Sequence, residues 1–306
     1  MTLRVAPLVK TLTANDYRVL RAIEKLRIRH EFAPIELLPR MTSMSYSYLS
    51  KRLKYLHKLN LLVRPAKKIP FEGVDLTFGA FDILALKGLT DHDFLINLGD
   101  QMGMGKESDV FVGTSEGDRP VAVKIHRLGK AEFRAIRRTR TYLAERRHLS
   151  SFYESRLAAE REFEALSRLF PKVRVPEPLA INRHIIVMEL IDGDQLYKVR
   201  HLTKEAIDSI FEEILEMIET SLAQIRIIHG DLSEFNIILR RETLDPVFFD
   251  YPQFAYIHEQ TAWNLFTRDI ENICHFFSKR FSLRVSDLPG LQNSLWNTSS
   301  IVKLIK

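Results

Sequence analysis

The sequence has 306 residues, of which 45% are hydrophobic and 27% charged, and its formal net charge is +6. This composition excludes a largely disordered chain, and the length is typical of two or three compact units. A single cysteine, Cys274, excludes disulfides within the chain and fits a reducing compartment. The strongest apolar run, Ile185 to Ile191, is too short to span a bilayer, so we expect a cytoplasmic protein with no membrane partner.

Residues 1–90 have the pattern of a winged helix-turn-helix domain, which is three helices followed by a two-stranded wing. Thr13 and Asp16 form a capping-box-like start for the first helix, and Pro34 suits the first turn of a short second helix. The third helix, the two wing strands and a connecting helix are expected at 46–59, 61–63, 74–77 and 81–89.

Basic residues are concentrated in this first segment. Residues 1–70 contain fifteen Lys or Arg and four Asp or Glu, a net charge of +11. Because neutralising phosphates releases condensed counterions, such a surface favours nucleic acid as a partner. The expected contacts are lysines of the third helix and of the wing: Lys51, Lys54, Lys58, Lys67 and Lys68. A solvated basic face without a partner is the plain alternative.

The remaining residues predict a larger α+β domain in two parts, 91–191 and 192–306. Strands are expected at 94–102, 109–114, 120–126 and 185–190, helices at 155–169 and from about 204, and a hairpin at 237–240 with 247–250. The end of the sequence is expected to be mostly helical.

An arginine-rich insertion, 127–154, interrupts the first part of this domain. Its arginines alternate with aromatic residues such as Phe152, and this combination can both neutralise phosphates and stack on bases. We therefore expect a flexible loop that contacts RNA through Arg137, Arg138 and Arg140. The alternative is a charged loop with no partner.

A glycine turn between two predicted strands is the first candidate site motif. The turn, Gly-Met-Gly-Lys-Glu-Ser-Asp-Val at 103–110, would let backbone N–H groups approach phosphate oxygens. Alone this signal is weak, because two glycines in a hairpin usually form only a turn. The residues that we assign to a nucleotide here are Gly103, Gly105, Lys106, Ser108 and Val110.

The second motif is the tetrapeptide Val-Ala-Val-Lys that ends at Lys124. Strand alternation puts Ala122 and Lys124 on one face, where the small alanine leaves room for a ligand and the lysine supplies positive charge for phosphates. A half-buried lysine needs a carboxylate partner. Glu162 is preferred because it shares the apolar side of its helix, while Glu160 and Glu164 are the other candidates.

The strongest motif is His-Gly-Asp-Leu-Ser-Glu-Phe-Asn at 229–236. Phosphoryl transfer needs a carboxylate near the attacking oxygen and oxygen ligands for Mg²⁺. Asp231 supplies the carboxylate and Asn236 a ligand, and the hairpin returns Asp250 beside Asn236 as the second metal ligand. A single aspartate in such a loop is more often a turn or cap residue, but the three motifs in this order favour an ATP site.

Together these segments resemble the RIO family of atypical protein kinases, in the short, archaeal-type form of the branch with an N-terminal winged helix. The matching pieces are GMGKESDV (103–110), VAVK (121–124), SRLAAEREFEAL (155–166), VMELIDG (187–193), HGDLSEFN (229–236) and FFDYPQ (248–253). The resemblance implies a winged helix-turn-helix domain followed by a trimmed bilobal protein-kinase-like domain. It implies ATP with Mg²⁺, or Mn²⁺, with Lys124 and Asp231 catalytic and with Asn236 and Asp250 as metal ligands.

The resemblance also implies an adenine site and a biological role. Met188 would be the gatekeeper, the Glu189 carbonyl and the Ile191 N–H would meet the adenine edge, and Ile238 would pack beneath the base. The implied reaction transfers phosphoryl to a protein hydroxyl, as in autophosphorylation, or to water. The implied partner is ribosomal RNA in a precursor of the small ribosomal subunit. No Ala-Pro-Glu motif follows Asp250, so the usual peptide-docking platform is missing.

Two other interpretations stay open. A nucleotide-gated RNA-binding assembly clamp would bind ATP and seldom hydrolyse it, although a pure clamp would not require the motif aspartates. A small-molecule kinase fused to a DNA-binding domain would use the same His-Gly-Asp loop, although the basic insertion speaks against it. The sequence leaves open the oligomeric state, the phosphoryl acceptor, and whether Asp231 acts as a base or Asp250 is transiently phosphorylated.

Overall fold

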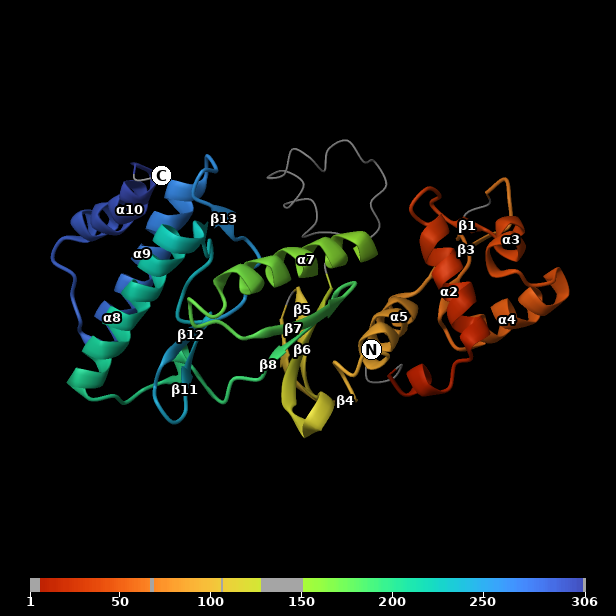
Figure 1. The fold of residues 1–306 in the computed structure, drawn as a ribbon, viewed down its shortest axis with the longest axis horizontal. Coiled ribbons are helices and arrows are strands. Elements are labelled where there is room, and N and C mark those ends of the chain that lie inside the picture. Colours follow the sequence, from red (N-terminus) through yellow and green to blue (C-terminus); the bar gives the residue numbers. More distant parts are fainter. Residues whose placement is uncertain (1–5, 67–68, 106, 128–150, 305–306) are drawn as a thin grey trace. The chain divides into compact units, whose positions relative to one another are not determined.

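The computed structural model describes residues 6–66, 69–105, 107–127 and 151–304 (Figure 1). The chain packs into two compact units, which we name the N-terminal unit (1–159 with 180–187) and the C-terminal unit (160–179 with 188–306). The domain limits expected from the sequence, at 90 and 191, stay a prediction.

Helices and short strands alternate along the chain. The helical segments are η1 (Ala6–Lys10), α2 (Ala14–Leu26), η2 (Ile35–Leu37), α3 (Leu38–Thr42), α4 (Tyr46–Lys58), α5 (Phe78–Thr90), η3 (Glu116–Asp118), α7 (Ser151–Leu169), η5 (Leu196–Lys198), α8 (Lys204–Thr220), η6 (Ser221–Ile225), α9 (Ala262–Phe281) and α10 (Leu288–Leu304). The strands are β1 (Ala33–Pro34), β2 (Leu62–Val63), β3 (Gly73–Leu76), β4 (Asn97–Met104), β5 (Ser108–Thr114), β6 (Pro120–His126), β7 (Pro178–Asn182), β8 (Ile185–Glu189), β9 (Gly193–Gln195), β10 (Ile227–Ile228), β11 (Ile237–Arg240), β12 (Pro246–Phe248) and β13 (Ala255–Tyr256). Among the described residues, none of these helices combines the length and the apolar character that crossing a bilayer requires.

The elements from η1 to α5 form a winged-helix domain. Thr13 caps α2 as predicted, and the Asp16 carboxylate accepts from the Thr13 N–H at 2.9 Å, which completes a capping box. Asp16 is fully buried, and Arg52 of α4 donates to it through Nε at 2.7 Å. One carboxylate therefore both starts α2 and ties it to α4.

The wing has three strands rather than the two that were predicted, in the order β1-β3-β2. The expectation for Pro34 was wrong in detail: it lies in β1, where Ala33 pairs with Val74, and the helix begins one residue later as η2 and continues as α3. Proline has no N–H to donate, so an edge strand of two residues tolerates it.

The main sheet, most of whose residues belong to the N-terminal unit, has the strand order β4-β5-β6-β8-β7. Helix α5 is apolar almost all round and buried along most of its length, as a helix enclosed by packing on every side must be. Its one buried acid, Asp82, accepts from His184 Nε2 at 2.9 Å and from Arg127 Nη2 at 2.7 Å. A paired carboxylate can be buried at this depth, whereas an unpaired one would be costly.

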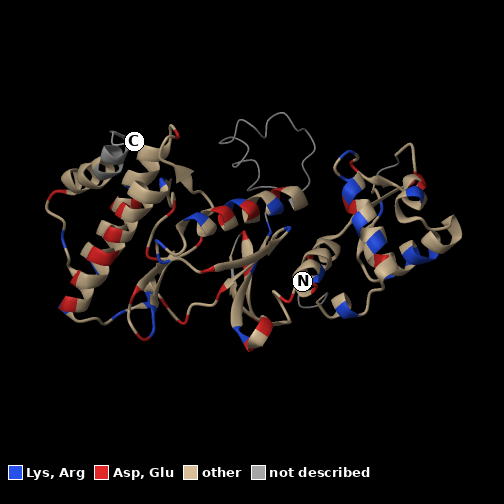
Figure 2. Cartoon of the chain, viewed as in Figure 1, with Lys and Arg blue, Asp and Glu red and all other residues tan. Residues whose placement is uncertain are grey.

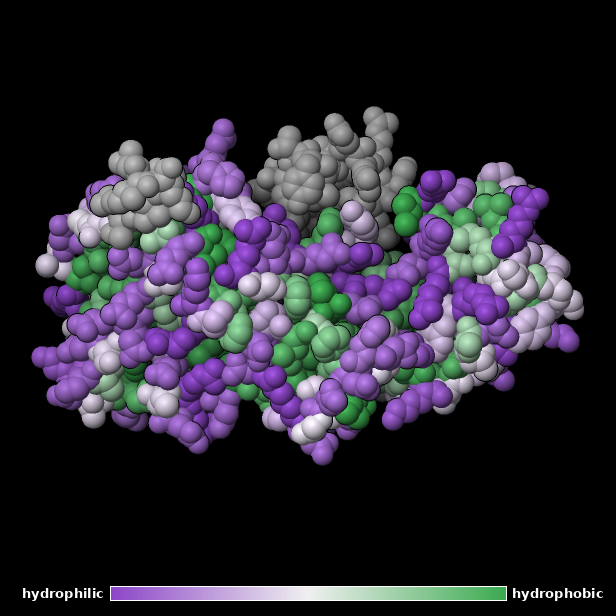
Figure 3. Space-filling view, viewed as in Figure 1, coloured by the Kyte–Doolittle hydropathy of each residue, from purple (hydrophilic) through white to green (hydrophobic). Residues whose placement is uncertain are grey.

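The C-terminal unit is built around α8 and α9. Thr203 caps α8, whose buried face includes Phe211, Ile214 and Ile218 as predicted, while Ile207 is only half-buried. Several acidic residues occur along α8 (Figure 2), where the surface is largely hydrophilic (Figure 3). Basic side chains gather instead on α2 and α4 (Figure 2).

The predicted hairpin is β11 with β12, joined antiparallel in a register that pairs Ile237 with Phe248. Strand β12 ends at Phe248, two residues before the predicted end. Asp250 follows with a left-handed backbone, φ = 64°, a conformation that aspartate tolerates better than most residues. Strand β9 extends this sheet beside β11, and three residues are too few for its pattern to be visible in the sequence.

The double role of Asp16 can be tested with Asp16→Asn. The uncharged amide has one oxygen acceptor in place of a charged carboxylate, so it cannot bond the Thr13 N–H and the Arg52 guanidinium equally well. We therefore expect the local stability to fall by about 2 kcal/mol. Amides of α2 should exchange hydrogen roughly 30-fold faster in the variant. The matched control is Asp93→Asn, an exposed aspartate after α5, with an expected change within about 0.5 kcal/mol. Unchanged exchange in α2 would contradict the role of this carboxylate.

Candidate active site

The loop 229–236 connects β10 to β11 in the C-terminal unit. Its backbone turns at Gly230, where φ is +80°. A Cβ atom at this position would lie 2.5 Å from the carbonyl oxygen of Gln253, so no other residue fits without a shift of the backbone. The glycine of the His-Gly-Asp motif is therefore required by the fold of the loop itself.

Two of the predicted site residues meet within this loop. The Asn236 side-chain N–H donates to the Asp231 backbone carbonyl at 2.7 Å. This bond fixes which end of the amide is which, because a carbonyl can only accept. The amide oxygen of Asn236 is thus the atom left to act as a ligand, in agreement with the type of donor that Mg²⁺ prefers.

Asp250 lies at the same end of the β11–β12 hairpin. The N–H of Phe249 donates to the carbonyl of Asn236 at 3.1 Å, so Asp250 directly follows a residue bonded to Asn236. The structure thus brings Asp231, Asn236 and Asp250 together. Their oxygens form a donor set that fits a hard divalent cation.

The charges of this cluster oppose one another. Burial raises the pKa of Asp231, the nearby Arg268 guanidinium lowers it, and the Asp250 carboxylate raises it. Two carboxylates that disfavour each other's ionisation would both be stabilised by a cation placed between them. The electrostatics therefore agree with the donor set.

His229, the first residue of the motif, is a buried histidine bonded to the backbone. Burial lowers its pKa to about 4, so the ring is neutral at pH 7. Its Nε2 lies 3.1 Å from the carbonyl oxygen of Phe249, which can only accept, so Nε2 carries the proton. The ring also packs on Tyr251, with centroids 4.1 Å apart.

Helix α9 holds the loop by its backbone, a feature that the sequence analysis missed. Asp269 accepts from the N–H groups of Gly230 and Leu232 at 2.7 and 2.9 Å. Arg268 donates to the Gly230 carbonyl, and Asn272 donates to the Leu232 carbonyl at 3.1 Å. Four hydrogen bonds from one helix therefore fix the backbone on both sides of Asp231.

One signal in the sequence could have revealed this contact. Asp269 falls on the apolar face of α9, three residues after Phe266 and next to Ile270, and all three side chains are buried. A carboxylate on a buried helix face requires a partner. The partner itself, a backbone segment nearly forty residues earlier, leaves no mark in residue spacing.

Glu162 is the buried member of the three candidate glutamates of α7, with 1% of its surface exposed. Its charge acts on the pKa of His229 and of Tyr251. Glu160 and Glu164 are exposed, and Glu164 accepts from the Tyr256 hydroxyl at 2.6 Å. Burial agrees with the choice of Glu162, and its pairing with Lys124 stays a prediction.

Lys124 and Ala122 are both buried on β6 of the N-terminal unit, and Lys124 stands opposite Val110 of β5. The predicted turn closes with a bond of 2.8 Å from the Gly105 N–H to the Ser108 carbonyl. At Gly103 a Cβ atom would meet nothing within 4 Å. Packing within the protein therefore does not require glycine at position 103. A glycine there would let a ligand approach the backbone.

A chain of side-chain contacts braces the strands of this turn. Asp109 accepts from Gln101 at 3.1 Å and from Arg127 Nε at 3.0 Å, and the same guanidinium reaches Asp82. Burial lowers the pKa of His184, which is fully buried, so it bonds Asp82 as a neutral ring. Arg127 therefore joins β5 to α5.

The residues expected around adenine belong to the C-terminal unit. Met188 and Ile191 are buried, the Glu189 carboxylate accepts from Arg240 at 2.8 Å, and Ile238 of β11 pairs with Gln195 of β9. Lys124 and the glycine turn belong to the N-terminal unit. That the two groups bind one nucleotide stays a prediction.

The expected nucleic-acid contacts divide into two groups. Lys51, Lys54 and Lys58 are exposed on α4 as predicted. The other nucleic-acid candidates lie outside the described residues: Lys67, Lys68, Arg137, Arg138 and Arg140. Lys106, which was expected to bind the nucleotide, also lies outside them. The expectation for Phe152 was wrong, because α7 already begins at Ser151 and the Phe152 ring packs on Phe78 and Phe81, at 4.7 and 5.2 Å.

Residues 109–288 match the RIO domain, and residues 9–92 match the N-terminal domain of Rio2. The chain belongs to the RIO family. The RIO-type serine/threonine-protein kinase Rio2 of Methanocaldococcus jannaschii is 37% identical over 82% of the chain and 91% of that relative. The serine/threonine-protein kinase rio2 of Dictyostelium discoideum is 34% identical over 90% of the chain. The chain spans about half the length of this second relative, 52%.

A solved structure agrees with the fold. The Rio2 kinase of Chaetomium thermophilum, in a complex described as ADP/Mg²⁺-phosphoaspartate, superposes with a TM-score of 0.81. Its sequence is 29% identical, and the match covers 98% of the chain and 93% of that protein. The family and the fold class predicted from the sequence, a winged helix followed by a kinase-like bilobal domain, are thereby confirmed.

The anchoring carboxylate predicts an unusual pH dependence. Burial raises the pKa of Asp269 from 3.8 to about 7, in spite of the two backbone N–H bonds that lower it. The folded protein therefore binds this proton more tightly than the unfolded chain, and the stability gained from protonation is lost as the pH rises from about 4 to about 7. His229 has the opposite effect, because its folded pKa of about 4 lies below the ordinary 6.5.

Asp269→Asn isolates the contribution of the carboxylate. The unfolding free energy of the wild type minus that of the variant should fall by up to about 4 kcal/mol between pH 4 and pH 7. Urea unfolding followed by tryptophan fluorescence measures it, since both tryptophans, Trp263 and Trp296, lie in the C-terminal unit. Asp208→Asn, at an exposed site on α8, is the control. A difference that does not vary with pH would contradict the raised pKa.

Proposed function

We propose that the chain is an ATP-dependent serine/threonine protein kinase and ATPase that binds Mg²⁺–ATP. The observation that carries this proposal is the convergence of Asp231, Asn236 and Asp250 at one end of the β11–β12 hairpin. Membership of the RIO family supports it, as do the serine/threonine-protein kinase names of the relatives and the ADP and Mg²⁺ bound to the Chaetomium protein.

We propose different roles for Asp231, Asn236 and Asp250 of the C-terminal unit. Asn236 and Asp250 would hold Mg²⁺, and Asp231 would act on the acceptor. A bound Mg²⁺ would offset the negative charge of the phosphates and of the two carboxylates. Asp231 has a raised pKa that suits a group which takes a proton. Lys124, Glu162 and the glycine turn are proposed to position the phosphates, and Met188, Glu189, Ile191 and Ile238 the adenine.

A carboxylate of the chain is proposed as the first phosphoryl acceptor. The phosphoaspartate of the Chaetomium relative supports this route. An oxygen of the Asp250 carboxylate would attack the γ-phosphorus while the bond from that phosphorus to the β-phosphate oxygen breaks and ADP leaves. Water, deprotonated by Asp231, would then hydrolyse the acyl phosphate to inorganic phosphate and restore the carboxylate. Direct transfer to a serine or threonine hydroxyl, with Asp231 as the base, is the alternative.

Substitution of each aspartate tests the reaction. Asp231→Asn and Asp250→Asn should each lower ATP turnover by at least about 100-fold, because each removes a charge that acts on the reacting phosphoryl group. Asp208→Asn, an exposed aspartate of the same unit, should leave turnover unchanged. Label from γ-labelled ATP should be released by hydroxylamine and should be absent from Asp250→Asn. Label that resists hydroxylamine would favour a serine or threonine acceptor, and full turnover in Asp231→Asn would contradict the assignment.

The proposed setting is maturation of the small ribosomal subunit in the cytoplasm, with ribosomal RNA of the precursor as the partner. The exposed lysines of α4 support RNA binding, and the single, buried Cys274 fits a reducing compartment. An assembly clamp that hydrolyses ATP slowly is the second candidate, favoured by the same lysines. ATP turnover that is negligible in the presence of RNA would support the clamp.

The lysines of α4 can be tested together. The triple variant Lys51→Ala, Lys54→Ala, Lys58→Ala should weaken binding to structured RNA by about the same factor for every sequence. The slope of log affinity against log salt should become shallower by up to about 2 to 3, since each of the three lost phosphate contacts contributes about 0.7 to 0.9. A control triple changes three exposed lysines of the C-terminal unit, Lys172, Lys198 and Lys204. If the two triple variants have equal slopes, α4 is not the RNA-binding surface.

A further inference from the structure

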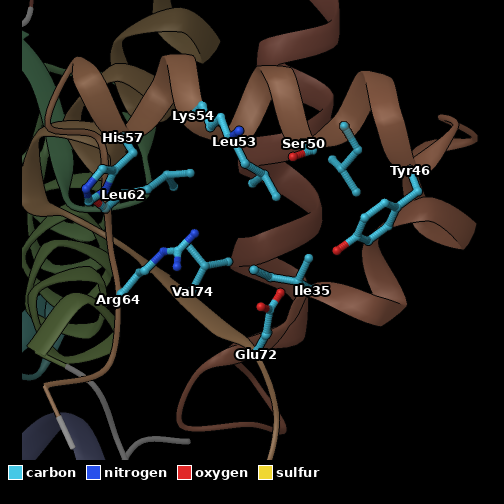
Figure 4. Close-up of a pocket in the computed structure, with 11 residues that line it drawn as sticks. Ile35, Tyr46, Ser50, Leu53, Lys54, His57, Leu62, Arg64, Glu72 and Val74 are labelled. Carbon is cyan, nitrogen blue, oxygen red and sulfur yellow. The ribbon is translucent and has the colours of Figure 1, made fainter. Parts of the chain in front are cut away.

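A small pocket opens in the winged-helix domain between α4 and the wing (Figure 4). Its volume is about 100 Å³, well below the roughly 300–1,000 Å³ of sites for drug-sized ligands. It is therefore of a size for one planar base or one side chain. The floor is apolar and is formed by Ile35, Leu49, Leu53, Leu62 and Val74.

Opposite charges stand at the rim of this pocket. Arg64 follows β2 and Glu72 precedes β3, so the two side chains reach the same space from the two arms of the wing (Figure 4). In the described part of the chain they form no ion pair with each other or with a third residue. Both residues are exposed, so a ligand that carries both acceptors and donors could bond to the two together.

We propose that this pocket binds the base of one guanosine in single-stranded RNA. The inference rests on the RNA binding proposed above and adds the base that the domain selects. Guanine offers two adjacent donors, N1–H and the N2 amino group, which match the two oxygens of Glu72. On another edge it offers the acceptors O6 and N7, which match the guanidinium of Arg64. Adenine and cytosine present one amino group and uracil one imino group, so none of them satisfies both carboxylate oxygens side by side.

The surroundings of the pocket favour RNA over a partner protein. Lys54 lines the pocket, and Lys51 and Lys58 are exposed on the same helix, so the backbone of a bound strand would meet positive charge. The rings of Tyr46 and Tyr48 are 61% and 41% exposed at the start of α4 and can stack on neighbouring bases. An apolar side chain of a protein would desolvate Arg64 and Glu72 and give neither a partner.

The test measures the affinity of the full chain for eight-nucleotide RNAs by fluorescence anisotropy. All positions are uridine except a central one, which is guanosine, adenosine, cytidine or uridine. We expect the guanosine RNA to bind at least about five-fold more tightly than the others. Glu72→Gln should remove this preference, and its effect on all-uridine RNA should be no larger than that of a control that also removes one negative charge. The matched control is Glu31→Gln, an exposed glutamate of the same domain outside the pocket, which should keep the preference.

Each outcome separates this inference from RNA binding itself. Lys51→Ala should weaken all four RNAs equally, because it removes a phosphate contact and no base contact. RNA binding without a guanosine preference, or a preference that survives Glu72→Gln, overturns the guanosine site and leaves the pocket to a protein side chain. Failure of all four RNAs to bind would instead overturn the RNA-binding proposal. Equal thermal melting of the two glutamate variants excludes misfolding as the cause.

Discussion

The N–H groups of Gly230 and Leu232 are held by a single buried carboxylate, that of Asp269. Without it, two buried donors would each cost about 1–3 kcal/mol. Asp231 stands between the two anchored residues, so its position in space follows from a bond made to its neighbours. Asn236 is in turn bonded to the Asp231 carbonyl, and the residue before Asp250 is bonded to Asn236. A series of hydrogen bonds that begins at Asp269 of α9 therefore connects Asp231, Asn236 and the residue before Asp250.

Placing these carboxylates close together costs electrostatic free energy, and the neighbouring groups of the protein offset it only in part. The Asp250 carboxylate raises the pKa of Asp231, and the Asp231 carboxylate raises the pKa of Asp269. Arg268 lowers the pKa of Asp231 and Asp269, and it also bonds the Gly230 carbonyl. Such self-repulsion is tolerated at functional sites because the missing positive charge is supplied by the ligand.

The sequence predicts what local pattern can encode. Thr13 as a cap, the exposed lysines of α4 and the β11–β12 hairpin all follow from spacing, and the structure confirms them. The motifs were sufficient to predict the family and the fold class, which the comparisons confirm. Pro34 was misassigned because its two-residue strand depends on pairing with Gly73 and Val74, about forty residues away, and not on its neighbours in the sequence. The roles of the site residues stay predictions.

In each unit, a charged side chain outside the motif holds the segment that carries the motif. The motif residues expected to face a ligand, such as Gly103 and Asp231, must be small or accessible, so other residues have to hold their loops in place. In the C-terminal unit the holding is done by Asp269. In the N-terminal unit it is done by Arg127, which binds Asp109 beside the glycine turn and Asp82 on α5. Asp269 is buried and Arg127 is half-buried. Both bond to residues that are distant in the sequence. The motifs therefore identify the candidate site residues of this chain, whereas charged residues outside the motifs, such as Asp269 and Arg127, help to fix the positions of the loops that carry them.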